Sequence, residues 1–280
     1  MTISIPKLPI GKTLEVIIDF LVDHFSVLTR IISDVTETGI DFLIDGLLYP
    51  PPWLFILIIT AIAYAITRKK MLSLFTFAGF ALILNMGLWS ATMSTLALVT
   101  VATLMTIAIG FPLGILAALN NTANKIIIPV LDFMQTMPAF VYLIPAIPFF
   151  GLGKVAAIFS TLVFAMPPSI RLTSLGIRQV PLELVEAADA FGSNKWQKLV
   201  KLQIPIATPT IMAGINQTIM LALSMVVIAA MIGAKGLGGE VWKAIQRLQP
   251  GKGFEAGLGI VILAIVLDRV MQSVGKNKNK

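Results

Sequence analysis

Few side chains in this sequence could perform acid–base, nucleophilic or metal chemistry. Its 280 residues include no cysteine and one histidine, His24, which excludes disulfides, thiolate metal sites, a cysteine nucleophile and a histidine metal cluster. Gly11-Lys12-Thr13 has the form of the end of a phosphate-binding loop, but Pro6 stands where that loop needs its first glycine. We therefore expect no catalytic residue, no metal site and no bound cofactor in this chain, and no ATPase activity of its own.

Outside the N-terminal segment, polar residues are densest between 171 and 205. Pro181 followed by several acids predicts a short helix start, because acids suit the first turns of a helix, and Gly192 predicts its end. A second amphipathic piece includes Trp196 and is expected to end at Pro205. The segment is thus predicted to form two short helices joined at a glycine.

Three apolar side chains make this segment more than a solvated connector. Phe191, Trp196 and Leu199 would be costly to leave in water, whereas they would suit a groove on another protein. The segment is therefore predicted to be a docking surface.

The elements that must hold this segment are helices in lipid. Apolar residues make up 57% of the chain and charged residues only 12%, with a mean hydropathy of +0.91, against roughly a quarter charged in soluble domains. No charged residue occurs in 46–67, 71–124 or 202–234, and about 20 apolar residues span the hydrocarbon as a helix. The pattern predicts an all-α polytopic membrane protein.

The apolar segments predict about seven transmembrane helices, the fifth ending at Pro167-Pro168 and the fourth broken by prolines. Their expected ranges are 53–67, 71–88, 93–119, 129–150, 155–170, 207–233 and 255–272. The spacing in Gly110-Phe-Pro-Leu-Gly114 predicts close helix packing, within the chain or across a dimer.

The N-terminal segment has a different pattern. Polar side chains recur at helical spacing over 12–37 opposite an apolar face, and a second, shorter helix is expected over 40–47. Its acids could not all avoid the bilayer core, so these helices should lie at the interface or on a partner.

The basic residues indicate topology rather than nucleic-acid binding, although the formal charge is +7. If Arg68-Lys69-Lys70 is cytoplasmic, alternation places Lys125, the 171–205 loop and the basic tail at 273–280 inside as well, as the positive-inside rule requires. The N-terminus is then outside, together with the loop that follows residue 233. Asn120-Asn121-Thr122 matches the glycosylation pattern. In that arrangement it lies on the cytoplasmic side, so we do not expect it to be a glycosylation site.

The 171–205 segment resembles the EAA loop of ABC-importer permeases. The family pattern is Glu-Ala-Ala, three residues, Gly, nine residues, then Ile, any residue, Leu-Pro, and the spacing matches throughout. Two positions depart from it, both conservatively, since Leu202 replaces Ile and Ile204 replaces Leu. The matching or neighbouring residues are Glu186, Ala187, Ala188, Gly192, Trp196, Leu202, Ile204 and Pro205.

This resemblance covers about 90–272 and implies the type I, binding-protein-dependent importer fold. It divides the chain into 1–51 (extracytoplasmic or interfacial), 52–89 (accessory helices), 90–272 (permease core) and 273–280 (tail). In that family the loop is the coupling helix that docks in a cytoplasmic ATPase subunit. The implied assembly is a homodimer with two ATPase subunits, which bind ATP and Mg, and an extracytoplasmic binding protein, in the cytoplasmic membrane of a prokaryote.

A second resemblance narrows the substrate class. Residues 131–142, 164–168 and 214–217 are similar to permeases for glycine betaine and related quaternary amines. They imply uptake of glycine betaine in osmoprotection, with choline, carnitine, proline or another amino acid as alternatives. An ion-coupled secondary carrier is a further alternative, but it would need more intramembrane ionisable residues than Asp132 and Asp268.

Candidates for the substrate pathway lie at the proline-rich break and in the 207–233 span. Prolines free backbone carbonyls that must then face protein or water, which favours a lined cavity, although packing kinks alone are the alternative. Aromatic faces can bind a quaternary ammonium, and mid-span amides can line a path or join helices. The candidate pathway residues are Met137, Pro138, Phe140, Tyr142, Asn216 and Gln217.

The charged residues after residue 234 and the single acid Asp132 are two further candidates, for protein docking and for an ion pair. Lys235-Gly-Leu-Gly-Gly-Glu240 predicts a turn followed by a short helix, and the bases Lys235, Lys243 and Arg247 are candidates for docking an acidic binding protein. Asp132 should pair with a partner or reach the interface, because an isolated charge is costly in the bilayer.

Overall fold

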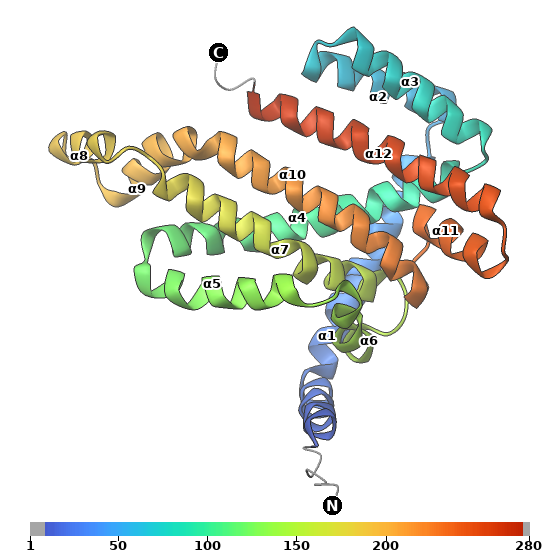
Figure 1. Cartoon of the computed structure of the whole chain (residues 1–280), viewed down its shortest axis with the longest axis horizontal. Helices are drawn as coiled ribbons and strands as arrows, with labels where there is room; N and C mark the ends of the chain where they lie inside the picture. The colour runs from blue at the N-terminus through green and yellow to red at the C-terminus, as the bar shows by residue number, and fades with distance from the viewer. Residues whose placement is uncertain (1–8, 277–280) are drawn as a thin grey trace, which may run out of the picture.

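The computed structural model describes residues 9–276, and every regular element in that range is helical. This confirms the expected all-α class (Figure 1). The helices are α1 (Ile10–Leu48), α2 (Pro52–Thr67), α3 (Lys70–Asn85), α4 (Trp89–Leu119), α5 (Asn121–Thr136), η1 (Ala139–Tyr142), α6 (Leu143–Phe150), α7 (Lys154–Arg178), α8 (Leu182–Ala190), α9 (Lys195–Lys198), the π-helix η2 (Leu199–Gln203), α10 (Ile204–Ala229), η3 (Ala230–Ile232), α11 (Leu237–Gln246) and α12 (Pro250–Lys276).

The core is formed by α4, α7 and α10, which pack along one another. Small residues allow this approach: a Cβ on Gly110 would lie 2.7 Å from Ser169 Oγ, and one on Gly114 would lie 2.6 Å from Thr173 Cβ. The predicted use of the Gly110–Gly114 spacing is therefore confirmed within the chain, as α4 against α7. The same device recurs at Gly214 of α10, whose Cβ would lie 3.1 Å from the Pro168 carbonyl oxygen.

The prediction that a span ends at Pro167-Pro168 is wrong. Both prolines are buried inside α7, which continues to Arg178. Two lost backbone donors would weaken an isolated helix, but α7 is held on both sides by α4 and α10. The polar loop consequently begins after Arg178 rather than at Arg171.

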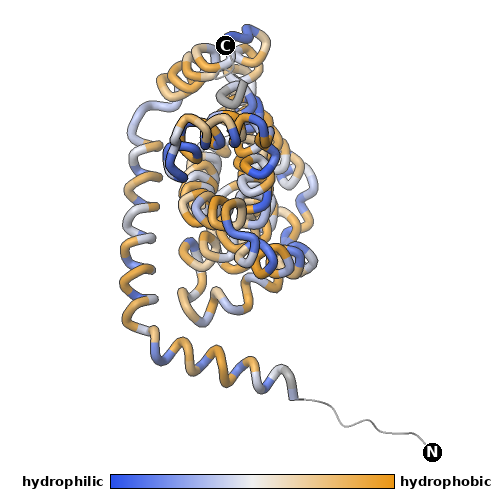
Figure 2. The backbone as a smooth tube through the Cα atoms, turned by 90° about the vertical axis from the view of Figure 1, so that its left-hand side faces the viewer, coloured by the Kyte–Doolittle hydropathy of each residue, from blue (hydrophilic) through white to orange (hydrophobic). Residues whose placement is uncertain are grey.

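The N-terminal segment is one helix, not two. α1 runs without interruption for 39 residues, because the segment around Gly39 contains no proline and a single glycine only weakens a helix. Its C-terminal part packs on α4 and α6, and its N-terminal part stands away from the other helices (Figure 2).

Fewer helices cross a membrane by length and composition than the seven predicted. In the described range, α4, α7 and the stretch Lys195–Ile232 each meet the requirement, and two bent pairs, Gly11–Leu48 with Pro52–Thr67 (97°) and Asn121–Thr136 with Ala139–Phe150 (111°), would make five. The apolar pattern predicts α2 and α3 as separate spans. Each has only 16 residues, so each is about 24 Å long, which is shorter than the hydrocarbon thickness of about 30 Å.

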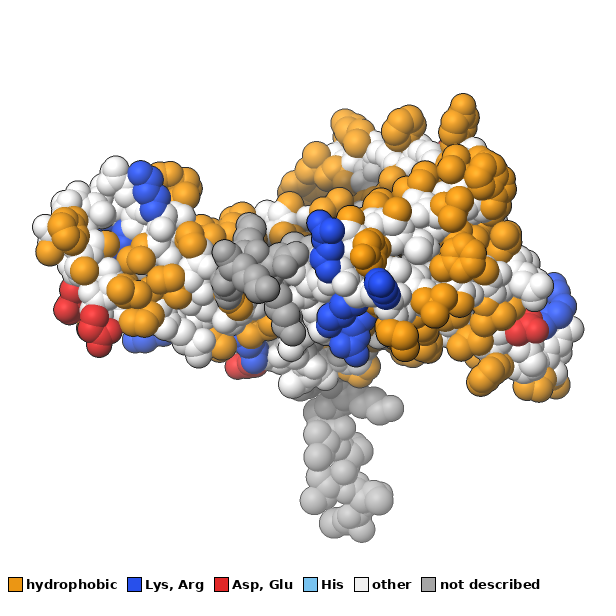
Figure 3. Space-filling view, turned by 90° about the horizontal axis from the view of Figure 1, so that it is seen from above, with side chains coloured by type: hydrophobic (Ala, Val, Ile, Leu, Met, Phe, Trp, Pro, Cys, Tyr) orange, Lys and Arg blue, Asp and Glu red, His pale blue; other side chains and the backbone are white. Residues whose placement is uncertain are grey.

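The surface agrees with a lipid environment. Exposed apolar side chains are spread over most of the face drawn in Figure 3. Among the described residues, Leu104 of α4 is 61% exposed and Val261 of α12 is 51% exposed. Such a surface would be costly in water and is expected in hydrocarbon.

Candidate functional site

The segment between α7 and α10 forms a protruding two-helix unit at one end of the bundle (Figure 1). We call residues 182–198, which contain α8 and α9, the α8–α9 knob. Gly192 ends α8 with a positive φ of 76°, and the Ser193 and Gly192 amides donate to the Ala188 and Asp189 carbonyls at 3.0 and 2.9 Å. This is the glycine-dependent C-cap that the sequence predicts.

Polar contacts brace the knob internally. Asn194 and Gln197 form a capping box at the start of α9, each side chain accepting from the other residue's backbone N–H. Lys198 Nζ binds Asp189 Oδ1 at 2.6 Å, which ties α9 back to α8. These contacts fix the geometry of the knob without using the rest of the bundle.

The knob exposes aromatic side chains that nothing in the described chain covers. Phe191 is 91% exposed and Trp196 is 71% exposed, and Leu182 on the same unit is 65% exposed. Glu186 and Ala187 are also exposed, whereas Ala188 is half-buried. A rigid unit that presents apolar side chains at a polar end of the molecule is suited to docking in a groove of another protein.

Leu199 does not belong to this docking surface, so the prediction made for it from the sequence is wrong. It is 2% exposed and packs with Ile177, Ala207 and Ile211. Phe111 of α4 packs against the same cluster. Leu199 therefore anchors the root of the knob to α7, α10 and α4.

The prediction that the second helical piece ends at Pro205 is also wrong. The helix passes from α9 through η2 into α10, and in η2 the Ile204 amide donates to the Leu199 carbonyl, five residues back. Pro205 has no N–H, and the wider π-turn accommodates its ring and its missing donor. Leu202 and Ile204 are half-buried on this continuous path from knob to core.

Arg178 supports the same root, although sequence reasoning assigns it no role. Its Nη2 donates to the Ala117 carbonyl at 2.7 Å and to Asn121 Oδ1 at 3.0 Å. These acceptors lie at the end of α4 and the start of α5, so the α4–α5 turn is fixed to the last residue of α7. An arginine at a helix C-terminus, where cations are favoured, is the only signal that could have found it.

The proline-rich break lies between α5 and α6, where the chain turns by 111°. Met137 and Pro138 occupy the break, Met137 half-buried and Pro138 exposed. Tyr142 is 6% exposed, and its hydroxyl donates to the Met134 carbonyl, which also accepts from the Met137 amide at the end of α5. The structure thus brings Met137, Pro138 and Tyr142 together, while Phe140 is 50% exposed on η1.

The aromatic side chains near the α5–α6 break and at the start of α4 do not come together as a cage for a quaternary ammonium. Tyr142 packs edge-to-face on Phe164 with ring centroids 5.7 Å apart. Trp89 instead contacts Phe55 and Phe80 of the α2–α3 hairpin. Trp89 therefore belongs to the packing of that hairpin.

Asn216 and Gln217 have different surroundings. Asn216 Nδ2 donates to Asp268 Oδ1 at 2.7 Å and joins α10 to α12, but its Oδ1 is buried without a partner among the described residues. Gln217 is exposed. Asp132, expected to find a partner, binds Arg171 of α7 at 2.6 Å.

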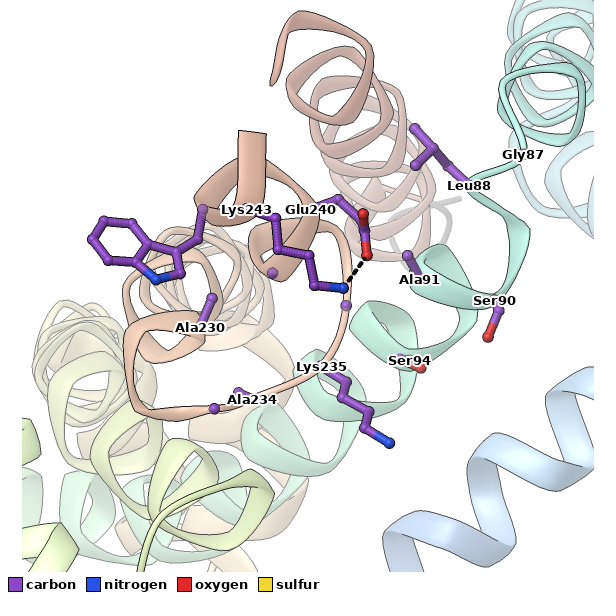
Figure 4. A pocket seen from close by; sticks show the side chains of 14 residues that line it. Gly87, Leu88, Ser90, Ala91, Ser94, Ala230, Ala234, Lys235, Glu240 and Lys243 are labelled. Atoms are coloured by element: carbon purple, nitrogen blue, oxygen red, sulfur yellow. Dashed lines mark hydrogen bonds and ion pairs between the residues drawn. The ribbon is translucent and has the colours of Figure 1, made fainter. Parts of the chain in front are cut away.

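The opposite end of the bundle carries a pocket of about 500 Å³ beside the predicted docking bases (Figure 4). It lies between the start of α4 and the segment from η3 to α11, and Lys235, Glu240 and Lys243 line it. Lys243 Nζ binds Glu240 Oε1 at 2.8 Å, an i,i+3 pair on α11. Arg247 lines a smaller, adjacent pocket of about 240 Å³.

No group of three or more histidine, cysteine, aspartate or glutamate side chains that could hold a metal occurs in the described range. The described residues combine three other features: a braced exposed knob at one end, a bent pair of helices within the bundle and a pocket at the other end.

These features are those of a binding-protein-dependent membrane permease, and the chain belongs to that family. Residues 110–279 match the binding-protein-dependent transport system inner membrane component. The chain is 49% identical to a glycine betaine/carnitine transport permease protein of Listeria monocytogenes, covering 98% of both chains. It is 46% identical to a glycine betaine transport system permease protein of Bacillus subtilis, covering 98% of this chain and 97% of the relative.

Solved structures support the fold. The inward-facing MetNI methionine ABC transporter matches with a TM-score of 0.57 and 23% identity, over 67% of this chain and 92% of that chain. The chain is thus a multi-pass inner-membrane permease component of the type I ABC importer fold, as the resemblance of its 171–205 segment implied.

Proposed function

We propose that this chain is the translocation subunit of an ATP-driven importer for glycine betaine and related quaternary amines. The observation that carries the substrate class is its similarity, at 46–49% identity over nearly the whole chain, to permeases named for glycine betaine transport. Carnitine and proline betaine occur in the names of relatives and are alternative substrates. The assembly would be a homodimer with two ATPase subunits and an external binding protein.

The α8–α9 knob is the proposed contact with the ATPase. Phe191 and Trp196 would fill a groove on that subunit, since aromatic side chains that are exposed when alone dominate the energy of many interfaces. ATP and Mg would bind in the partner, whose closure would push the knob. Leu199 and Arg178 would carry that displacement to the ends of α4, α7 and α10.

The moving part is the irregular backbone between α5 and α6. The chain turns by 111° at this break, and irregular backbone at membrane depth is tolerated only where it faces protein or water. A hinge there could open the path toward one side or the other. Asn216 on α10 and the break on α5–α6 are the proposed pathway-lining elements.

The other end of the bundle is the proposed outer face. α10 has 26 residues, or about 39 Å of helix, so α11 lies a membrane thickness from the knob. The bases Lys235, Lys243 and Arg247 would meet acidic residues of the binding protein there. The N-terminus would then lie outside and the C-terminus in the cytoplasm.

Uptake with reconstituted subunits tests the proposal. Proteoliposomes containing this chain, its ATPase and the binding protein should accumulate radiolabelled glycine betaine only when ATP is present on the knob side. Trp196→Ala and Phe191→Ala should each reduce uptake more than tenfold and weaken co-purification of the ATPase, because an interface hot spot contributes about 2 kcal/mol or more.

Met71→Ala is the matched control, since Met71 is 81% exposed but lies on α3, away from the knob. Uptake driven by an ion gradient without an ATPase would instead establish a secondary carrier and refute the proposal.

A further inference from the structure

α5 carries two exposed stripes of different chemistry. Three of its exposed side chains are apolar, namely Ile126, Val130 and Phe133. Three others are polar and form a separate stripe, namely Asp132, Gln135 and Thr136. With 3.6 residues per turn these stripes occupy different faces of the helix, and Leu131, which is 2% exposed, marks a third face that packs on the bundle. The two exposed faces of α5 are therefore suited to two different surroundings.

The polar stripe is tied to α7 by an ion pair. Arg171 Nη2 donates to Asp132 Oδ1 at 2.6 Å, and α5 lies beside α7 (Figure 1). The Asp132 side chain is 59% exposed and the Arg171 side chain 37% exposed, so the described part of the chain does not cover the pair. A guanidinium has five N–H donors, and among the described residues only Nη2 of Arg171 has an acceptor. The exposed part of the pair therefore needs water or another polar group beside it.

The ion pair lies along the bundle rather than at its end. Arg178 Nη2 and Asn121 Oδ1 are 3.0 Å apart and mark the knob end of α7 and α5. At 1.5 Å per residue, Arg171 is about 10 Å from that end and Asp132 about 16 Å, within a hydrocarbon layer of about 30 Å. Charged side chains at such depth face the interior of the protein or a water-filled cavity. The polar stripe consequently does not face lipid, whereas the apolar stripe is suited to it.

We propose that Asp132, Gln135 and Arg171 line the half of the translocation path nearer the knob and are in contact with water there. The inference rests on the proposed function and deepens it, because it assigns one face of α5 and α7 to the path. Thr136 is the last residue of α5, so the polar stripe leads to the Met137-Pro138 break. Opposite charges 2.6 Å apart form a wall that is polar but locally neutral, which suits passage of a zwitterion without tight binding of simple ions.

A thiol at Gln135 tests whether this face is in contact with water. Gln135 is exposed and stands three residues after Asp132, a spacing that places side chains about 5–6 Å apart on a helix surface. In the reconstituted importer, Gln135→Cys should react with small cationic and anionic methanethiosulfonates added on both sides of the membrane, because the reactive thiolate forms in water. Phe133→Cys is the matched control, since Phe133 is 66% exposed on the apolar stripe of the same helix and should not react.

The charges of the pair should determine which reagent reacts faster. In the Gln135→Cys protein, Asp132→Asn leaves Arg171 unpaired and should favour the anionic reagent, whereas Arg171→Gln should favour the cationic one. Each rate should change about threefold, the effect of one unit charge roughly 6 Å away in water. The ratio of the two rates cancels any change in the pKa of the thiol. Combining Asp132→Asn with Arg171→Gln should restore the original ratio.

Two results would overturn the inference. If Gln135→Cys reacts no faster than Phe133→Cys, the polar stripe is not exposed to water and is covered by protein, such as the second copy. If neither charge variant changes the ratio of rates, the ion pair does not face the space that contains the thiol. Labelling requires no transport, so a wild-type importer that fails to accumulate glycine betaine refutes the proposed function separately, whatever the labelling shows.

Discussion

Single small residues set how closely the core helices approach. At Gly114 the nearest atoms to an added methyl group would be Thr173 Cβ at 2.6 Å and the Ile170 carbonyl oxygen at 2.8 Å. The second contact is with backbone, which cannot rotate away. In lipid, where water does not drive apolar surfaces together, such close van der Waals packing is a main source of helix association.

Gly114→Ala should therefore destabilise the protein even though alanine is the better helix former. Overpacking of this kind costs about 1–3 kcal/mol, which we expect to appear as a lower unfolding temperature of the detergent-purified chain. Gly257→Ala is the control, because a Cβ at Gly257 meets nothing within 4 Å. A Gly114→Ala protein as stable as the control would show that α4 and α7 can separate freely.

At this scale the sequence predicts motifs better than partners. The spacing of Gly110 and Gly114 indicates close packing, and Gly192 indicates a helix end, because these uses depend on the absence of a Cβ. Leu199 carries no such mark, since an exposed and a buried leucine look alike in sequence. The role of Arg178 cannot be predicted from the sequence either, because its hydrogen-bond acceptors lie on a turn about 60 residues away in the chain.

At the scale of elements, the α8–α9 knob separates two kinds of apolar side chain. Phe191 and Trp196 are exposed to the surroundings, whereas Leu199, one turn after Trp196, is enclosed by Ile177 and Ala207. The sequence predicts both short helices and the amphipathic character of the segment. It does not predict that the chain continues as helix through Pro205, because that depends on a π-turn with no sequence signature.

Leu199→Ala should consequently reduce the stability of the chain, whereas Trp196→Ala should reduce its binding to the ATPase. Removing a buried leucine costs about 2–5 kcal/mol, so Leu199→Ala should lower the unfolding temperature. Trp196→Ala should leave the unfolding temperature of the isolated chain unchanged and reduce ATPase binding. Thermal unfolding of each purified variant, beside ATPase co-purification, separates the two, and a large loss of stability in Trp196→Ala would argue that the knob is only a structural connector.

α1 stands away from the other helices over its N-terminal part (Figure 2). Its polar link to the core is Lys154, at the start of α7, which binds Asp41 and lies 3.6 Å from Glu37. Lys154 is 21% exposed, so this link is more protected than a surface pair. The sequence does not predict a single long helix here, because the polar spacing changes near residue 39 and a change of spacing resembles a break.

Lys154→Gln should loosen the C-terminal half of α1. Loss of a partly buried pair, about 1 kcal/mol, should raise hydrogen exchange in residues 31–48 roughly fivefold. Lys252→Gln, which removes an equally basic side chain from α12, should leave that exchange unchanged. If exchange in α1 is the same in both variants, apolar packing on α4 and α6 holds the helix without the ion pair.

The whole molecule places its functional parts at two ends of one rigid core. α4, α7 and α10 run between the α8–α9 knob and the pocket beside α11, and the broken α5–α6 pair lies along them (Figure 1). The composition predicts a helical membrane protein because apolar content and charge-free segments are global properties. The number of crossings is less predictable, since it depends on how α1, α2, α5 and α6 bend.

The absence of cysteine makes the orientation directly measurable. A thiol introduced at Gln246, on α11, should react with a membrane-impermeant maleimide added to intact cells, because α11 lies at the end proposed to face outward. A thiol at Asn194, between α8 and α9, should be protected until the cells are permeabilised. Both positions are exposed in the structure, so protection would come from the membrane rather than from the fold. Labelling of Asn194→Cys from outside would mean that the chain has the opposite orientation, with the knob on the side away from ATP hydrolysis. Neither the ATPase contact nor the docking of the binding protein at α11 could then work as proposed.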